Sequence, residues 1–376
     1  MSLPRARFVL VFLLACTTMT QAHPRDAFER VTPEQAGYSS ARLAELRTFL
    51  QQSGSDSLLL LHDGKVFFEW GDIHKKLLVH SMRKALLNSL YGIAVQRGDI
   101  DLKQTLGQLG IDDIPPGLSD QELSATLDDV LKSRSGVYHP AAAEAESMIQ
   151  GRPARGSHAP GTFYYYNNWD FNVAGRILER RTGQRLYDAF YEQIAKPLGM
   201  RDYHNRIVVA AADGAVTDPD ADGYYQYEPE RSRYPAYHFR MSAYDLALYG
   251  QLYLNRGRWQ GRQIVPEAWI DRSTQPYSIV DAQYGLAYGM LWDVLVPDAG
   301  DEHPSFFHTG VGVHMLAIYP KHHLVMVHRV DTEHAYRFND GDLYPLIHLV
   351  HAARLAQGPG SAATKAARIG IGRTGK

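Results

Sequence analysis

The stretch VHSMRKALLNSLYGIAVQRG, residues 79–98, poses the question that decides the interpretation of this chain. Its apolar residues recur at helical spacing and would cover one face of a helix: Leu86, Leu87, Leu90, Tyr91, Ile93 and Ala94. Ser81 and Lys84, the only S-x-x-K of the chain, stand at its N-terminal end and share a helix face. Backbone N–H groups there favour an anion, and a neutral lysine can accept a hydroxyl proton. Taken alone, however, the stretch favours an ordinary core helix with a capping serine and a solvated lysine.

Two later stretches carry polar residues that bear on this choice. PGTFYYYNNWDFNVAG, residues 160–175, places Tyr166-Asn167-Asn168 after a Pro-Gly dipeptide. FFHTGVGVHM, residues 306–315, places His308-Thr309-Gly310 in a strand pattern, whereas the other T-G dipeptides end a helix or lie in the C-terminal tail. The three motifs therefore follow one another in the order S-x-x-K, Y-x-N and H-T-G.

This order resembles the signature of the serine β-lactamase-like hydrolases. That group includes penicillin-binding proteins, class C β-lactamases, family VIII esterases and 6-aminohexanoate-dimer hydrolases. The resemblance covers roughly residues 35–355, and residues 132–140 and 240–269 are similar to two further segments of the family. It implies an α/β (α+β) β-lactamase-like fold, in which an antiparallel sheet is flanked by helices and carries an inserted helical lobe.

The resemblance also implies a role for each motif residue. Ser81 would be the nucleophile, and Lys84 and Tyr166 would share the proton transfer. Asn168 would bind Lys84 or the substrate amide. The backbone N–H groups of Ser81 and Val311 would form the oxyanion hole, on a strand that also presents the supporting residues His308, Thr309 and Gly310.

Two features of these motifs leave alternatives open. Tyr165-Tyr166-Asn167 also reads Y-x-N, and we choose Tyr166 as the catalytic tyrosine because the family places it six residues after the proline. His308 stands where enzymes that bind penicillins usually have a lysine. Histidine is mostly neutral at pH 7 and anchors an anionic substrate weakly, which favours the esterase and 6-aminohexanoate-dimer hydrolase branches.

Composition and the N-terminus limit the classes of partner. The formal net charge of −2, without a long basic run, gives no reason to expect nucleic acid. The scattered histidines lack zinc spacing, so we expect no metal and no cofactor. Residues 1–22 have the layout of a secretory signal peptide, with lipidation of Cys16 as the alternative, and the apolar run is too short to span a bilayer.

The patterns along the chain predict one hydrolase domain over residues 23–356 and a mobile tail over 357–376. Its sheet part would comprise about 35–100 and 284–356, and its helical lobe about 100–283, with a cleft between them. The elements expected are helices over 38–53, 172–183, 245–257 and 343–356, a hairpin over 57–71, an irregular loop over 218–235, and consecutive antiparallel strands over 288–297, 305–320 and 323–330.

The sequence therefore predicts a secreted or periplasmic serine hydrolase that cleaves a small ester or amide through an acyl-enzyme on Ser81. A true β-lactamase or D-alanyl-D-alanine carboxypeptidase is the alternative among enzymes. A catalytically silent binding protein on the same fold is the alternative from another class. The sequence predicts no oligomeric state.

Overall fold

The computed structural model describes residues 27–210, 216, 218 and 220–355. In that part of the chain an eight-stranded sheet has the order β2-β1-β14-β13-β12-β11-β10-β9, and its ladders are antiparallel. Its strands are β1 (Ser57–His62), β2 (Lys65–Gly71), β9 (Ser278–Asp281), β10 (Leu286–Tyr288), β11 (Asp293–Leu295), β12 (Phe306–Gly310), β13 (His314–Tyr319) and β14 (Leu324–Arg329). The sheet thus joins strands from both ends of the described chain.

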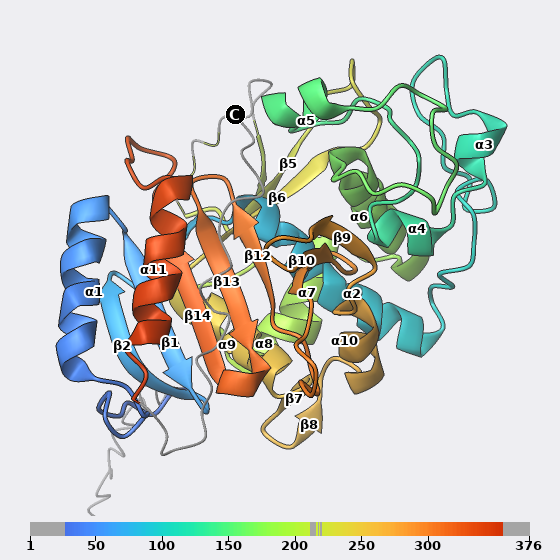
Figure 1. Cartoon of the computed structure of the whole chain (residues 1–376). Coiled ribbons are helices and arrows are strands. Elements are labelled where there is room, and N and C mark those ends of the chain that lie inside the picture. Colours follow the sequence, from blue (N-terminus) through green and yellow to red (C-terminus); the bar gives the residue numbers. More distant parts are fainter. Residues whose placement is uncertain (1–26, 211–215, 217, 219, 356–376) are drawn as a thin grey trace, which may run out of the picture.

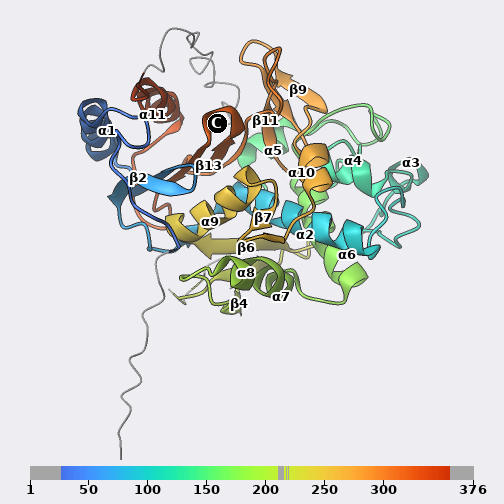
Figure 2. The ribbon, with the colours of Figure 1, turned by 90° about the horizontal axis from the view of Figure 1, so that it is seen from below.

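Helices cover both faces of this sheet (Figures 1 and 2). One face carries α1 (Ser40–Ser53) and α11 (Asp340–Ala352), and the other carries α9 (Ala243–Leu254), behind which lies α2 (Arg83–Arg97). Successive strand residues point to opposite faces of the sheet. Leu58 and Leu60 therefore pack in the core under α1 and α11, and Leu59 and Leu61 pack in the core on the side of α9. Burial on both faces explains why β1 is a continuous apolar run.

The rest of the chain forms short helices and two smaller sheets. The first small sheet has the order β3-β6-β5-β4, and the second pairs β7 with β8. These strands are β3 (Leu77–Leu78), β4 (Ile207–Val209), β5 (Gly223–Gln226), β6 (Ala236–Met241), β7 (Arg258–Trp259) and β8 (Arg262–Gln263). The helices are α3 (Asp120–Leu123), α4 (Leu127–Leu131), α5 (Glu146–Gly151), α6 (Asn168–Thr182), α7 (Leu186–Phe190), α8 (Lys196–Leu198) and α10 (Glu267–Ser273). Single helical turns are η1 (His80–Met82), η2 (Tyr191–Ala195) and η3 (Pro320–His322).

Elements with strong local signals were predicted correctly. The helix expected over 38–53 is α1, whose N-cap Ser39 accepts a hydrogen bond from the Arg42 amide and whose C-cap Gly54 is left-handed. The hairpin around Asp63-Gly64 is β1–β2. Helices were also found at the other three places, but α6 and α11 begin at Asn168 and Asp340, earlier than predicted, and α9 ends at Leu254 instead of 257.

Two predictions about strands were wrong. The segment 218–235 contains β5, which pairs with β4 and β6 and is too short to show a period of two. The segments 288–297 and 305–320 are not single strands, because the first contains β11 and the end of β10 and the second contains β12 and β13. Leu291 and Val313 turn the chain at positive φ, and apolar residues give no turn signal in a sequence.

Several other predictions stand outside what the fold decides. The signal peptide, Cys16 and the tail over 357–376 lie outside the described residues. The bounds of the sheet part and the helical lobe stay predictions, although β9 already belongs to the main sheet. Among the described residues, no helix is both long enough and apolar enough to cross a membrane.

Candidate active site

Ser81, Lys84 and Tyr166 lie together at the start of α2. Ser81 is half-buried on η1, and Lys84, on the first turn of α2, is 1% exposed. The Lys84 ammonium donates to Ser81 Oγ at 2.8 Å and to Tyr166 OH at 2.6 Å. Its Nζ also lies 4.6 Å from the centre of the Phe171 ring. A serine, a lysine and a tyrosine in hydrogen-bond contact can transfer protons among themselves.

The loop before α6 brings Tyr166 to Lys84. Ser133 holds both of its neighbours, because the Ser133 hydroxyl donates to Tyr165 O at 2.7 Å and accepts from the Asn167 amide at 3.1 Å. Asn167 is the N-cap of α6. The Tyr165 hydroxyl instead donates to Met148 O. The structure therefore places the hydroxyl of Tyr166 beside the lysine, whereas that of Tyr165 turns to α5.

Asn168 lies beside these residues but makes a different contact from the one expected. Its side-chain amide donates to Ala143 O at 2.5 Å, and within the described chain its buried Oδ1 has no hydrogen-bond partner. The structure therefore shows no hydrogen bond from this oxygen to Lys84. What Asn168 does hold is the loop that passes Ala143.

The strand β12 runs past the nucleophile. A Cβ on Gly310 would lie 2.6 Å from Val79 O and 3.1 Å from the Cβ of His80. Only a glycine allows this close approach between β12 and the segment that leads to Ser81. The approach brings Thr309, Gly310 and Val311 to the same cavity as Ser81.

His308 does not line that cavity. Its side chain is fully buried, and Nδ1 donates to Thr309 O at 2.8 Å, because a carbonyl oxygen can only accept. The imidazole centre is 6.4 Å from that of Tyr166. His308 is thus placed to support the tyrosine and the strand, and it is too deep to meet a substrate carboxylate at the cavity surface.

A cavity of about 600 Å³ opens over Ser81. Apolar and aromatic side chains form much of its wall, among them Met148, Val313, Phe338 and the exposed Val311 and Tyr336. Of the described residues that line it, Asp340 is the one with a formal charge at neutral pH. The cavity therefore suits an uncharged or cationic substrate with an apolar group.

Two buried ionisable side chains, His80 and Asp170, have pKa values shifted in the direction that favours their neutral forms. Burial lowers the pKa of His80 to about 4, and the nearby charges of Arg329, Lys84 and Arg83 act in the same direction. Burial likewise raises the pKa of the Asp170 carboxyl well above its ordinary value, although the Ser135 hydroxyl opposes this by donating to it at 2.6 Å. Burial thus favours the neutral form of both the His80 imidazole and the Asp170 carboxyl.

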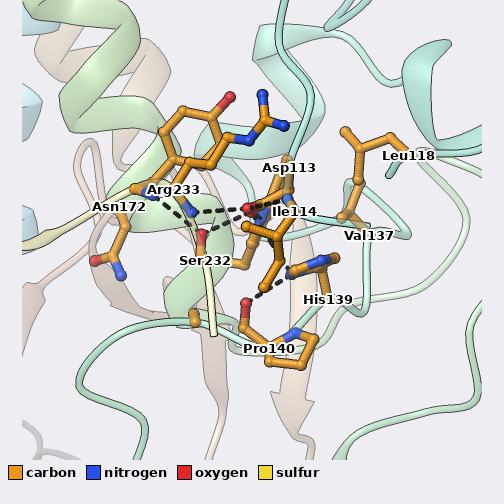
Figure 3. A network of polar contacts seen from close by, with 12 residues as sticks. Asp113, Ile114, Leu118, Val137, His139, Pro140, Asn172, Ser232 and Arg233 are labelled. Atoms are coloured by element: carbon orange, nitrogen blue, oxygen red, sulfur yellow. Dashed lines mark hydrogen bonds and ion pairs between the residues drawn. The ribbon is translucent and has the colours of Figure 1, made fainter. Parts of the chain in front are cut away.

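A buried aspartate that the sequence did not single out holds the neighbouring loop (Figure 3). Asp113 accepts hydrogen bonds from the Ser232 hydroxyl at 2.6 Å, from the Trp169 indole at 2.7 Å and from the Arg233 amide at 2.7 Å. His139 lies 3.6 Å from the same carboxylate. The serine contacts the carboxylate and not the histidine, so this is not a Ser-His-Asp triad.

The Asp113 network positions three carbonyls that face α6. Val137 O, Ala142 O and Ala143 O accept from the side chains of Asn167, Asn172 and Asn168 respectively. The loop of residues 137–143 thereby aligns the start of α6, which follows Tyr166 directly. No group of three His, Cys, Asp or Glu side chains could hold a metal ion in the described residues.

A family model matches this arrangement over most of the chain. The model, described as Beta-lactamase, matches residues 44–347. The chain belongs to the β-lactamase family. It therefore belongs to a family of serine hydrolases with the β-lactamase fold, and the predicted fold class is confirmed.

Individual relatives are more distant. A putative 6-aminohexanoate-dimer hydrolase from Bacillus anthracis is 18% identical, with a TM-score of 0.62 over 88% of this chain and 89% of that one. A family VIII carboxylesterase is 16% identical, with a TM-score of 0.58 over 84% and 99%. A putative D-alanyl-D-alanine carboxypeptidase from Escherichia coli K12 is 24% identical over 50% of this chain and 52% of its own length. The chain thus spans about half the length of this curated relative, and less of two others.

Proposed function

We propose that this β-lactamase-family protein is an exported serine hydrolase that cleaves an ester through an acyl-enzyme on Ser81. The observation that carries the proposal is the position of Lys84 Nζ, 2.8 Å from Ser81 Oγ and 2.6 Å from Tyr166 OH. Its contact with both hydroxyls provides a path by which the serine proton can leave. Export rests on the signal-peptide layout of residues 1–22.

The proposed reaction has two halves. Ser81 Oγ attacks the carbonyl carbon while its proton passes to the Lys84–Tyr166 pair, of which one member must first be deprotonated, as a neutral amine or a phenolate. The N–H groups of Ser81 and Val311 stabilise the oxyanion, and the pair then protonates the leaving alcohol as the acyl-enzyme forms. In the second half the same pair takes a proton from water, the resulting hydroxide attacks the acyl carbon, and Ser81 regains its proton.

An ester with an apolar group fits the cavity better than a substrate that carries a carboxylate. The wall offers apolar surface at Val311 and Tyr336 and a single negative charge at Asp340. His308, where penicillin-binding enzymes usually have a lysine, is fully buried. The similarity to a family VIII carboxylesterase agrees with this choice, and the curated carboxypeptidase relative keeps a peptidase activity as the alternative.

Hydrolysis of p-nitrophenyl butyrate and nitrocefin by the purified full chain tests the proposal. We expect ester hydrolysis that exceeds nitrocefin hydrolysis and that disappears in Ser81→Ala. A matched control is Ser89→Ala on the same helix, whose buried hydroxyl donates to Leu86 O and does not reach the cavity. Rapid nitrocefin turnover without ester cleavage would favour a β-lactamase. The absence of any Ser81-dependent adduct with a fluorophosphonate would favour a catalytically silent protein.

A further inference from the structure

His80, the residue before Ser81, has an unusual backbone conformation. Its φ is +48°, in the left-handed region that residues with a Cβ seldom occupy. Such conformations persist where surrounding contacts impose them, and they concentrate at functional sites. Because His80 and Ser81 share a peptide bond, the conformation of His80 determines where the Ser81 N–H points.

The His80 side chain is held from the side of the sheet. Its Nε2 lies 2.7 Å from the Thr332 hydroxyl, and its ring centre is 5.5 Å from that of His314 on β13. Thr332 also presses on the turn after Val311, because a Cβ on Gly312 would lie 2.1 Å from the Thr332 methyl carbon. Thr332 thus contacts both segments that carry the proposed oxyanion-hole donors, at His80 beside Ser81 and at Gly312 beside Val311.

A fully buried arginine, Arg329 on β14, contacts His314 and the strand that precedes His80. The Arg329 guanidinium donates to His314 Nδ1 at 3.1 Å, to Leu77 O at 2.7 Å and to Met241 O. With Leu78 O at 3.2 Å, the acceptors are three backbone carbonyls and an imidazole, with no carboxylate among them. A planar guanidinium can bridge several acceptors at once, so it joins β14 to β3, the strand that leads to Ser81.

The contacts form two connections to one point. Arg329 holds the two carbonyls of β3, which lie four and three residues before Ser81, and through His314 it also supports the ring of His80. Thr332 ties that ring to the turn after β12. We name His80, His314, Arg329 and Thr332 the Arg329 cluster.

We propose that the Arg329 cluster positions the oxyanion hole, by fixing the Ser81 N–H relative to the Val311 N–H through the strained backbone of His80. This inference rests on the proposed function, in which those two N–H groups stabilise the oxyanion. The members of the cluster are positioning residues, since they touch the backbone that presents the donors and not the reacting atoms.

Thr332→Val tests the cluster because it removes the hydroxyl bonded to His80 and keeps the methyl group beside Gly312. We expect kcat for p-nitrophenyl butyrate to fall about tenfold with KM within twofold, because an oxyanion donor out of place weakens transition-state binding. The more specific readout is the ratio of kcat/KM for this ester to that for its thiono analogue. Sulfur accepts hydrogen bonds poorly, so this ratio reports the oxyanion hole, and we expect it to fall.

Two further variants make the result decisive. Thr332→Ser keeps the hydroxyl and should retain the wild-type ratio. Ser55→Ala removes a matched hydroxyl, which lies 2.9 Å from Nε2 of His328 on β14, and should leave kcat and the ratio unchanged. A wild-type ratio in Thr332→Val, or equal losses for the oxo and thiono esters, would overturn the inference. If the wild-type chain hydrolysed the ester no faster than Ser81→Ala, the proposed function itself would be refuted.

Discussion

Replacement of Gly310 by alanine tests directly whether β12 and the segment before Ser81 must touch. The added Cβ would lie 2.6 Å from Val79 O, where ordinary van der Waals contact begins near 3.4 Å. The backbone at Gly310 and the backbone at Val79 would have to separate by about 0.8 Å, because the new Cβ meets a backbone oxygen that cannot rotate away as the end of a side chain can. Catalytic geometry tolerates about 0.5 Å, and a displacement of about 1 Å costs on the order of a hundredfold in rate.

We therefore expect Gly310→Ala to reduce kcat for p-nitrophenyl butyrate about 30- to 100-fold. The free energy of unfolding should fall by about 1–3 kcal/mol, which lowers Tm by only a few degrees and leaves the variant folded. Steady-state kinetics and thermal unfolding followed by circular dichroism measure the two effects separately. Active-site titration with a fluorophosphonate shows what fraction of the variant is folded and competent.

Gly250→Ala is the matched control. Its Cβ would lie 2.6 Å from a methyl carbon of Val325, the same overlap in the core between α9 and the sheet. The gain in helix propensity of about 1 kcal/mol offsets part of the overpacking, so a modest fall in Tm without a fall in kcat is expected. If Gly310→Ala kept kcat within threefold of the wild type, the reasoning from close approach would be refuted.

Three further predictions follow from single contacts. Tyr166→Phe removes the hydroxyl 2.6 Å from Lys84 Nζ and should lower kcat/KM by at least about a hundredfold; a loss below fivefold would contradict a role in proton transfer. Asp113→Asn turns a buried acceptor into a partial donor and should lower the free energy of unfolding in urea by about 3 kcal/mol, whereas a change under about 1 kcal/mol would show that the network of Figure 3 carries little stability. Burial lowers the pKa of His328 to about 4, so as pH falls the unfolded chain binds a proton at this residue before the folded chain does. Neutral His328 makes its full contribution to the free energy of unfolding above about pH 6.5, and about 3 kcal/mol of that free energy is lost as pH falls towards 4. Urea unfolding at pH 7 and pH 5 should therefore show a smaller difference for His328→Gln, and an equal difference would contradict this assignment.

Local signals were sufficient for part of the fold. The caps at Ser39 and Gly54 and the Asp63-Gly64 turn act through neighbouring residues, so a single sequence displays them. The strands β5 and β11 were missed or merged because four or fewer residues show no clear period. Their strand conformation depends on partners elsewhere in the chain, which no local pattern reveals.

For the candidate site, the sequence by itself determined which residue types stand at which spacings. Ser81 and Lys84 share a helix face by their separation, and the resemblance to the family singled out Tyr166 as their companion. The structure brings these three into hydrogen-bond contact. Their catalytic roles stay predictions until Ser81→Ala and Tyr166→Phe are assayed.

Only the tertiary structure decided what surrounds them. That His308 is fully buried, that Asn168 binds Ala143 O, and that Arg329 ends on the carbonyl of Leu77, 252 residues away in the chain, follow from the packing of distant segments. The partners in the last two contacts are backbone carbonyls, which every residue possesses, and burial is a property of the assembled core. The types and spacing of residues therefore predict the reacting groups from sequence, whereas the groups that hold them in place are determined by tertiary packing.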